Sequence, residues 1–231
     1  MTYDFAAGEI LLIDKPLDWT SFDVVKKVRN TLRVKKIGHA GTLDPLASGL
    51  LILCTGKFTK RIEEIQNQEK EYTGTITIGQ TTPSYDRETP VSETCDISAI
   101  TPKAIYEAAH SFVGTIEQVP PLYSAVMVDG KRAYDLARKG KSAELKPRSI
   151  TVKSFDIVSI DGAEVAFKVV CTKGTYIRSL AHDLGQKLGY GAHLSSLIRT
   201  RIGEYKLEDA LTIQDIQEIR RAQIEADGSN S

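Results

Sequence analysis

The chain has 231 residues, enough for one large domain or two small ones, and its 41% hydrophobic and 26% charged residues are typical of a globular protein. Lys and Arg total 30 and Asp and Glu total 30, so a net charge of zero argues against a uniformly basic nucleic-acid binder. No apolar run reaches the length of a membrane span, and the N-terminus lacks the pattern of a secretory signal. We therefore expect a cytoplasmic protein.

The three cysteines, Cys54, Cys95 and Cys171, are far apart and form no C-x-x-C pair. The four histidines show no ligand spacing either. We therefore expect reduced, buried thiols, with no disulfide framework and no metal site.

The charges are unevenly distributed along the chain. Residues 23–36 hold six Lys/Arg against one acid, and residues 131–153 hold eight against two. Residues 204–231 hold seven acids against three bases. Two basic patches and an acidic tail indicate a polyanion bound on one face, although basic runs are also typical of solvated helix surfaces.

The first part of the chain alternates strands and helices. Residues 8–15 are short and apolar and predict a strand. Thr20-Ser-Phe-Asp23 is typical of a capping box, so a helix begins there. Its predicted buried face consists of Phe22, Val25, Val28 and Leu32.

Later elements follow from periodicity and turn residues. We expect strands over 50–54, 70–79 and 195–202, a hairpin of 150–160 and 164–171, and helices over 58–65, 102–113, 132–138, from Arg178 to about 188, and over 212–221. Pro120-Pro121 places the segment 114–130 at an edge or in a loop.

The stretch 38–56 is the most informative part of the sequence. Its one permanent charge is Asp44, surrounded by glycines and small residues and followed by Pro45 and an apolar run. Proline disfavours helical φ/ψ at the residue before it, so Asp44 lies on a tight loop ahead of a buried strand. Loops held by a scaffold are common places for catalytic groups, whereas the simpler interpretation is an ordinary Asp-Pro turn.

A nucleophilic carboxylate must be ionised, which a neighbouring cation favours. Arg178 is the best candidate, because it lies beside Gly174 and Tyr176 where a strand meets a helix. The alternative is a surface arginine at a helix start. Tyr72 and Tyr176 are candidates for an aromatic wall, or else are core residues, and His39 either enters the site or caps a turn.

The residues 38–49, G-H-A-G-T-L-D-P-L-A-S-G, closely resemble the catalytic motif of the bacterial tRNA pseudouridine-55 synthases, the TruB family. Further motifs resemble that family in the same order: I-D-K-P-x-x-W-T-S at 13–21, K-E-Y at 70–72, P-P-x-Y-S-A at 120–125, K-G-T-Y-I-R at 173–178 and G-A-H-L at 191–194. The resemblance covers roughly residues 8 to 205.

The resemblance implies a role for each candidate residue. Asp44 matches the catalytic nucleophile and Arg178 the arginine that pairs with it. Tyr72 matches the tyrosine that stacks on the target base, and Tyr176 one that lines the pocket. The remaining matches are His39, which occupies the space left by the flipped nucleotide, Asp86, a polar contact to uracil, and Leu197, on the pocket floor.

The resemblance also implies the fold and the reaction. We expect an α+β fold with a mixed, largely antiparallel sheet flanked by helices and a central catalytic cleft. The expected activity is isomerisation of the T-arm uridine of tRNA, with base flipping and without a cofactor. No membrane association and no obligatory protein partner are expected.

Two other functions stay open. One is a non-catalytic RNA-binding or RNA-folding protein on the same scaffold, and the other is a carboxylate-dependent nucleosidase.

Many members of the family carry an additional C-terminal RNA-binding domain of the PUA type. Only 28 residues follow Gly203, too few for such a domain. We expect one catalytic domain over 1–222 and a disordered polar tail over 223–231, without a PUA domain.

Overall fold

The computed structural model describes residues 3–128, 130–140 and 144–228. The chain divides into two compact units: unit 1 is Met1–Glu71 with Ile198–Ser231, and unit 2 is Tyr72–Leu197. The boundaries fall inside strands β4 (Lys70–Ile78) and β12 (Ala192–Ile202), so each of these strands contributes residues to both units.

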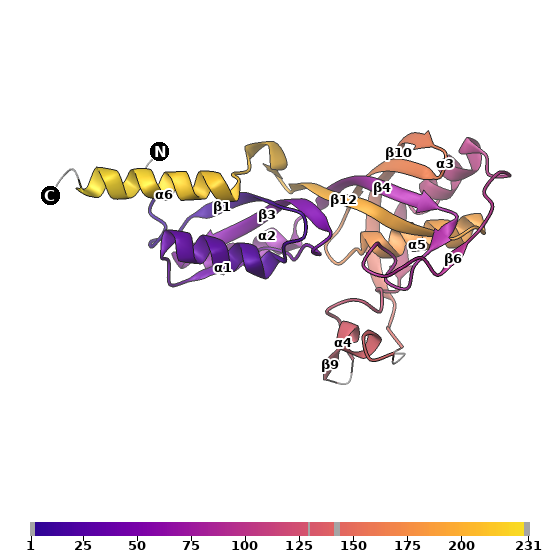
Figure 1. The fold of residues 1–231 in the computed structure, drawn as a ribbon, viewed down its shortest axis with the longest axis horizontal. Coiled ribbons are helices and arrows are strands. Elements are labelled where there is room, and N and C mark those ends of the chain that lie inside the picture. Colours follow the sequence, from indigo (N-terminus) through magenta and orange to yellow (C-terminus); the bar gives the residue numbers. More distant parts are fainter. Residues whose placement is uncertain (1–2, 129, 141–143, 229–231) are drawn as a thin grey trace. The chain divides into compact units, whose positions relative to one another are not determined.

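Unit 1 is built on the strand order β1-β3-β12, with β2 paired to β3 and β13 paired to β12 (Figure 1). Strands β1 and β2 both pair antiparallel with β3. The elements of this unit, besides its parts of β4 and β12, are β1 (Ile10–Lys15), α1 (Ser21–Leu32), β2 (Ile37–His39), β3 (Ala47–Thr55), η1 (Gly56–Arg61), α2 (Ile62–Asn67), β13 (Tyr205–Lys206), η2 (Leu207–Asp209) and α6 (Ile213–Gly228).

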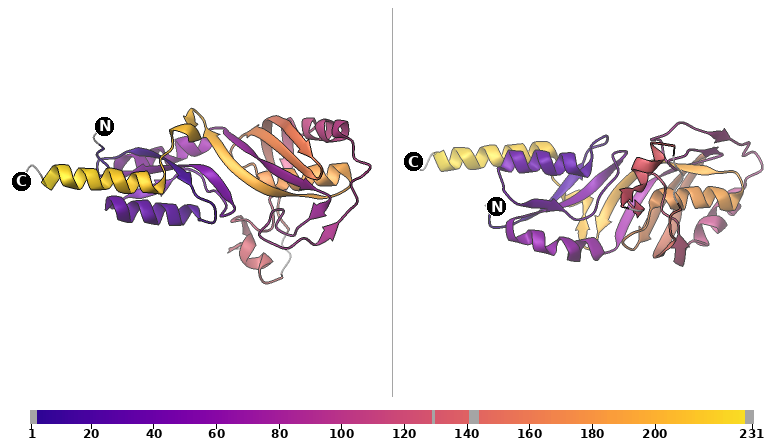
Figure 2. Two further views of the ribbon diagram at one scale, coloured as in Figure 1. Left: turned by 45° about the horizontal axis from the view of Figure 1, so that its top comes forward. Right: turned by 90° about the horizontal axis from the view of Figure 1, so that it is seen from below.

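The predicted strand over 50–54 is confirmed, and β3 is buried on both faces. Leu51 and Leu53 pack with α1 and α6, whereas Leu50 and Ile52 pack with Ile65 of α2. Figure 2 shows α1 and α6 side by side on one face of these strands and α2 on the other. A strand covered on both faces has no solvent side, which explains why its sequence is continuously apolar rather than alternating.

The predicted capping box at the start of α1 is confirmed. The Asp23 backbone N–H donates to Thr20 Oγ1 at 3.0 Å, and the Thr20 backbone N–H donates to the Asp23 carboxylate at 3.0 Å. The prediction that Phe22 belongs to the buried face is wrong, because its side chain is 66% exposed. Val24 takes its place in the core, together with the correctly predicted Val25, Val28 and Leu32.

The terminal helix α6 is longer than the sequence predicts, since it extends to Gly228 through residues 223–228, where a polar tail was expected. Two contacts account for the extension. Ile213, Ile216 and Ile219 pack against the core beside α1, and the Gln223 side-chain amide donates to the Tyr3 carbonyl at 3.0 Å.

Unit 2 contains the strand order β12-β4-β11-β10-β7. The pair β10–β11 is antiparallel, as in the predicted hairpin, and β7 also pairs antiparallel with β10. The other elements of this unit are β5 (Gln80–Thr81), β6 (Glu93–Thr94), α3 (Pro102–His110), β7 (Gly114–Gln118), β8 (Met127–Val128), β9 (Lys131–Arg132), α4 (Ala133–Ala137), β10 (Arg148–Asp161), β11 (Glu164–Cys171) and α5 (Ile177–Leu188).

The core of unit 2 uses one face of the β10–β11 hairpin. Val165, Phe167, Val169 and Cys171 alternate inward on β11 and are at most 1% exposed, as predicted. Phe155 of β10 meets Phe167 edge to face at 5.8 Å. Helices α3 and α5 contact each other, and α3 covers β10. The small segment of β8, β9 and α4 projects from this unit (Figure 1).

We predict that Thr20→Ala lowers the free energy of unfolding by about 1 kcal/mol, because the Asp23 backbone N–H in the first turn of α1 loses its capping acceptor. Urea denaturation followed by circular dichroism measures the change. Thr20→Ser, which keeps the hydroxyl, is the control and should lose less. An unchanged midpoint for Thr20→Ala would contradict the contribution of the cap.

Candidate active site

Asp44 lies on the loop 40–46 that connects β2 to β3. The Asp44 carbonyl accepts from the Ala47 N–H at 3.1 Å, which forms the turn after the Asp-Pro pair. The Ser21 hydroxyl, at the start of α1, donates to the Leu43 carbonyl at 3.1 Å and accepts from the Leu43 N–H at 2.9 Å. The backbone of the loop is therefore held immediately before the carboxylate.

Lys15, at the end of β1, holds the loop immediately after the carboxylate. It is fully buried, and its Nζ donates to the carbonyls of Trp19 at 2.6 Å, Pro16 at 2.9 Å and Pro45 at 3.4 Å. Burial lowers the pKa of Lys15 to about 8, and the charges of Asp44 and Asp18 partly oppose this shift. The Asp18 N–H donates to the same Pro45 carbonyl at 2.9 Å.

His39 lies at the end of β2, close to the same loop. Burial lowers the pKa of His39, a hydrogen bond with the Gly41 backbone opposes the shift, and the positive charge of Arg199 adds to it. The imidazole is therefore neutral at pH 7. Among the described residues, its buried Nδ1 has no hydrogen-bond partner.

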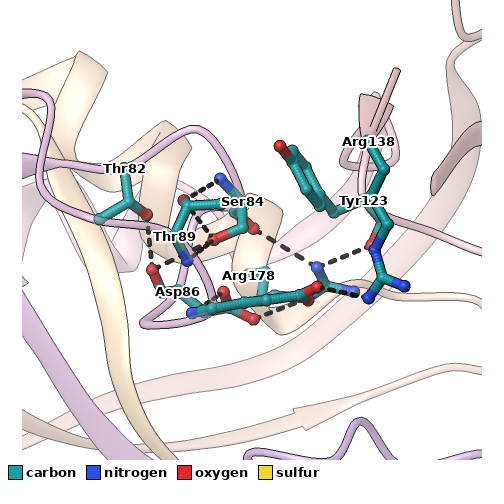
Figure 3. A network of polar contacts seen from close by, with 8 residues as sticks. Thr82, Ser84, Asp86, Thr89, Tyr123, Arg138 and Arg178 are labelled. Atoms are coloured by element: carbon teal, nitrogen blue, oxygen red, sulfur yellow. Dashed lines mark hydrogen bonds and ion pairs between the residues drawn. The ribbon is translucent and has the colours of Figure 1, made fainter. Parts of the chain in front are cut away.

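In unit 2, Arg178 in the first turn of α5 is buried beside the loop 82–89 (Figure 3). Its guanidinium donates to the carbonyl of Tyr123 at 2.8 Å and to that of Ser84 at 3.4 Å. Its Nε lies 3.6 Å from Oδ2 of Asp86, and both side chains are less than 10% exposed. The arginine predicted to be a surface residue or a counter-ion is thus a buried, anchored cation.

Asp86 is itself held by its own loop. Its Oδ1 accepts from the Glu88 N–H at 2.9 Å, and its carbonyl accepts from the Thr82 hydroxyl at 2.6 Å. Ser84 and Thr89 bond each other across the same turn, and Glu88 pairs with Arg138 at 3.0 Å (Figure 3). The structure therefore brings together Asp86 and Arg178. A direct contact of Asp86 with uracil stays a prediction.

The other predicted residues of unit 2 lie on two strands and at the start of one helix. Tyr72 on β4 is 8% exposed and Leu197 on β12 is 9% exposed. Tyr176 is the N-cap residue of α5, and the buried Gln118 side chain bonds both its N–H and its carbonyl, at 2.8 and 3.0 Å. Asp44 and His39 belong to unit 1, and their meeting with the residues of unit 2 stays a prediction of the resemblance.

Two buried cations beside the Asp44 loop, Lys15 and Arg199, were missed as site residues. Strand alternation gives a sequence signal for Lys15, whereas for Arg199 the alternation is opposed by the greater hydropathy of its neighbour Ile198. Lys15 follows Leu11 and Ile13 in the inward phase of β1, and Arg199 follows Leu197 in the inward phase of β12.

Next to Asp86, Tyr85 adopts a left-handed backbone with φ of 64°, and its ring stacks on His182 of α5 with 3.8 Å between centroids. Burial lowers the pKa of His182 and raises the pKa of Tyr85, and the neighbouring charge of Asp183 adds to the latter shift. Burial also raises the pKa of Asp183 to about 6. This cluster packs the loop 82–89 against the helix that carries Arg178.

A pocket of about 600 Å³ in unit 2 borders the loop 82–89, and Thr82, Arg87, Glu164 and His193 are among the residues that line it. None of the predicted site residues lines it. Within the described part of the chain, no group of three His, Cys, Asp or Glu is placed to hold a metal ion, and no helix is long and apolar enough to cross a membrane.

Two family models together match residues 29–229 of the chain. Residues 29–177 match the family described as TruB family pseudouridylate synthase (N terminal domain), and residues 178–229 match the tRNA pseudouridylate synthase B C-terminal domain. The chain is 52% identical over 221 residues to tRNA pseudouridine synthase B of Phocaeicola vulgatus, covering 93% of this chain and 94% of the relative. The protein of that name from Bacteroides thetaiotaomicron is 51% identical over 239 residues, covering 99% and 100%.

The fold of this chain is also similar to those of solved structures. A chain from the crystal structure of a Cbf5-Nop10-Gar1 complex aligns with a TM-score of 0.73 and 32% identity, over 93% of this chain and 54% of that one. A chain from the archaeal box H/ACA sRNP Nop10-Cbf5 complex gives 0.70 and 28%, over 94% and 55%. The present chain spans about half the length of these solved chains. The similarity confirms the predicted α+β fold class.

We predict that Asp183→Asn stabilises the protein at neutral pH. The folded-state pKa of about 6 is above the usual 3.8, so the folded protein binds the proton more tightly and its stability falls as pH rises from about 4 to 6. The variant should gain on the order of 1 to 2 kcal/mol at pH 7.5, less than the full shift because the side chain is only partly buried, and nothing at pH 4.

Urea denaturation at the two pH values measures this difference for Asp183→Asn and for Asp156→Asn, an exposed carboxylate on β10. An equal gain for both variants, or a gain at pH 4 as large as at pH 7.5, would contradict the burial of Asp183.

Proposed function

The chain belongs to the TruB family of pseudouridylate synthases, a family of isomerases, and we propose that it converts the T-arm uridine at position 55 of tRNA to pseudouridine. Its relatives carry the name tRNA pseudouridine synthase B and match it over nearly their whole length. One observation carries the mechanism we propose: a carboxylate, Asp44, stands on a loop whose backbone is bonded on both sides of it.

The reaction needs a nucleophile and a pocket, and no redox partner. The N1–C1′ bond breaks, the ring turns, and a C5–C1′ bond forms, while C5 loses a proton and N1 gains one. Atoms and electrons balance within the nucleotide and its solvent-exchangeable protons. Asp44 acts as the nucleophile, at either ring C6 or sugar C1′, and a positioned group or water moves the C5 proton.

Arg178 supplies the positive charge for the ionised Asp44 in this proposal. Its contacts with Asp86, Ser84 and Tyr123 support the assignment, since a guanidinium held by several partners is fixed before the substrate arrives. Asp86 then acts by holding Arg178. A preorganised charge is effective because no rearrangement is needed as the reaction proceeds.

The remaining residues form the walls of the proposed pocket. Tyr72 stacks on the uracil, Tyr176 and Leu197 line the pocket, and His39 fills the space that the flipped nucleotide leaves. A neutral imidazole suits that role, and the burial that lowers the pKa of His39 favours the neutral form. The target base must leave its stack to reach such a pocket, and aromatic faces repay part of the lost stacking.

Two exposed basic surfaces are proposed to bind the phosphates of the RNA. On α1, Lys26 and Arg29 point to solvent while the valines face the core. The second surface is the basic segment, residues 131–153, of which Lys141 lies outside the described residues. Every described Lys and Arg in it is exposed, and Arg132 and Arg138 both lie over the Tyr134 ring. Phosphate contacts hold the RNA in register without reading its sequence.

We predict that Asp44→Asn lowers pseudouridine formation by about 10⁴-fold or more, because the amide cannot replace the nucleophile. The substrate is a T-arm stem-loop, and carbodiimide mapping with mass measurement is the assay. Asp156→Asn is the control and should keep full activity.

The same assay separates the alternatives. Release of free uracil would indicate a nucleosidase, since isomerisation leaves the RNA mass unchanged. Binding of the stem-loop without any pseudouridine in the wild type would indicate an RNA-binding protein. Full activity of Asp44→Asn would reject Asp44 as the nucleophile.

We predict that RNA binding weakens steeply with salt and that neutralising the basic segment reduces this dependence. The triple variant Lys131→Ala, Arg132→Ala, Lys139→Ala should lower the slope of log affinity against log salt by about 0.7 for each lost phosphate contact. Fluorescence anisotropy with a labelled stem-loop measures the slope. Lys103→Ala, an exposed lysine on α3 paired with Glu107, is the control. Identical slopes for the wild type and the triple variant would remove the segment from the interface.

A further inference from the structure

Arg199 is a charged side chain that the proposed chemistry leaves unused. It lies on β12 in unit 1 and is 1% exposed, among the largest fully buried side chains of the described chain. Its neighbours along the strand, Ile198 and Thr200, are more exposed than the arginine. A guanidinium is normally excluded from such a position, because its burial is costly unless every N–H group finds an acceptor.

The three nitrogens of Arg199 all bond the backbone around Asp44. Nε donates to the Leu50 carbonyl at 2.8 Å, Nη2 to the Gly41 carbonyl at 3.0 Å, and Nη1 to the Thr42 carbonyl at 3.3 Å. Gly41 and Thr42 precede Asp44, whereas Leu50 lies in β3 after it. One rigid, planar group therefore joins the two stems of the loop that carries the carboxylate.

The backbone of Arg199 also lies close to Gly49 of β3, the strand that follows the loop. Gly49 has φ of 96°, and a Cβ atom there would lie 2.5 Å from the Arg199 carbonyl oxygen. Glycine thus permits β3 to approach β12 closely enough for the guanidinium to reach Leu50. The position of Arg199 relative to the loop is set by its main chain as well as by its side chain.

The positive charge of Arg199 also affects Lys15 and His39. Burial is the main cause of the lowered pKa of Lys15 and of His39, and the positive charge of Arg199 adds to both shifts. Replacing buried charged groups by well-packed apolar side chains of similar volume is often neutral or stabilising, so filling the core does not by itself require an arginine. The retained arginine therefore points to a requirement for the shape of the loop.

We propose that Arg199 is a positioning residue for the reaction: by holding Gly41, Thr42 and Leu50 at a fixed separation, it aims the Asp44 carboxylate at the bound nucleotide. It acts through the backbone and does not touch the substrate. The proposal rests on the proposed function, with Asp44 as the nucleophile. Displacing a reacting group by about 1 Å is enough to slow a reaction by about a hundredfold.

The test compares Arg199→Lys with Arg201→Lys. Lysine keeps the positive charge at position 199 but replaces the planar guanidinium group by a single ammonium group. Arg201 lies two residues further along the same strand and bonds Glu69 and the Gly203 carbonyl, away from the loop. Single-turnover pseudouridine formation on the T-arm stem-loop gives the rate, anisotropy gives the dissociation constant, and hydrogen exchange reports on the amides of residues 40–50.

We expect Arg199→Lys to lower the single-turnover rate about 10- to 100-fold while the dissociation constant changes less than about twofold. Hydrogen exchange should accelerate at 40–50 and stay unchanged elsewhere. Arg201→Lys should match the wild type in rate. A rate for a folded Arg199→Lys equal to that of Arg201→Lys would overturn the proposal.

If Arg199→Lys does not fold, Arg199→Gln, whose amide keeps planar donors, takes its place. Failure of both to fold would make Arg199 a residue of fold stability and reject the positioning role. If the wild type makes no pseudouridine, the proposed function fails instead. The exchange measurement still decides whether Arg199 holds the loop.

Discussion

Burying a positive charge requires that hydrogen-bond acceptors surround it, and this constraint shapes the loops of the protein. Four cationic side chains are buried in the described chain: Lys15, Lys70, Arg178 and Arg199. Each donates to backbone carbonyl groups. An unsatisfied buried cation costs several kcal/mol, so each loop must adopt the conformation that presents its carbonyls. The cations thereby turn flexible connections into defined structures.

The consequence for chemistry is that each of two loops is held in a defined conformation within its own unit. Loop 40–46 is bonded by Ser21, Lys15 and Arg199, and loop 82–89 by Arg178. Uracil is neutral, so a pocket that takes a free ring must supply positioned groups rather than strong fields. Groups held before the substrate binds lose little entropy when it arrives. We infer that the proposed isomerisation depends on this preorganisation more than on any one contact.

The buried and the exposed positive charges differ in what they contact. The buried cations bond the loops, whereas the cations on α1 and over 131–153 that the structure describes as exposed lie at the surface, where a polyanion can reach them. A zero net charge is therefore compatible with an RNA partner, because what a polyanion meets is the local surface rather than the sum.

Local patterns in the sequence already determined most of the elements, the capping box at Thr20, the loop carrying Asp44 and the family. Periodicity and capping act between residues a few positions apart, so they can be read without a fold. The same patterns misplaced Phe22, because Val24 lies in the core in its place. They also ended α6 too early, since its last turns depend on a bond between Gln223 and Tyr3.

Only the tertiary structure shows which charged side chains are buried and which backbone groups they bond. In β12, hydropathy favours Ile198 over Arg199 as the inward residue, yet the arginine is enclosed and the isoleucine is 38% exposed. Arg199 can be buried because its guanidinium donates to the Leu50 carbonyl, 149 positions away in the sequence. A pattern among neighbouring residues cannot reveal such a distant acceptor. The pairing of Asp86 with Arg178 likewise joins residues that only the fold brings together. The residues themselves could be named from the sequence, but their partners depend on packing between distant segments.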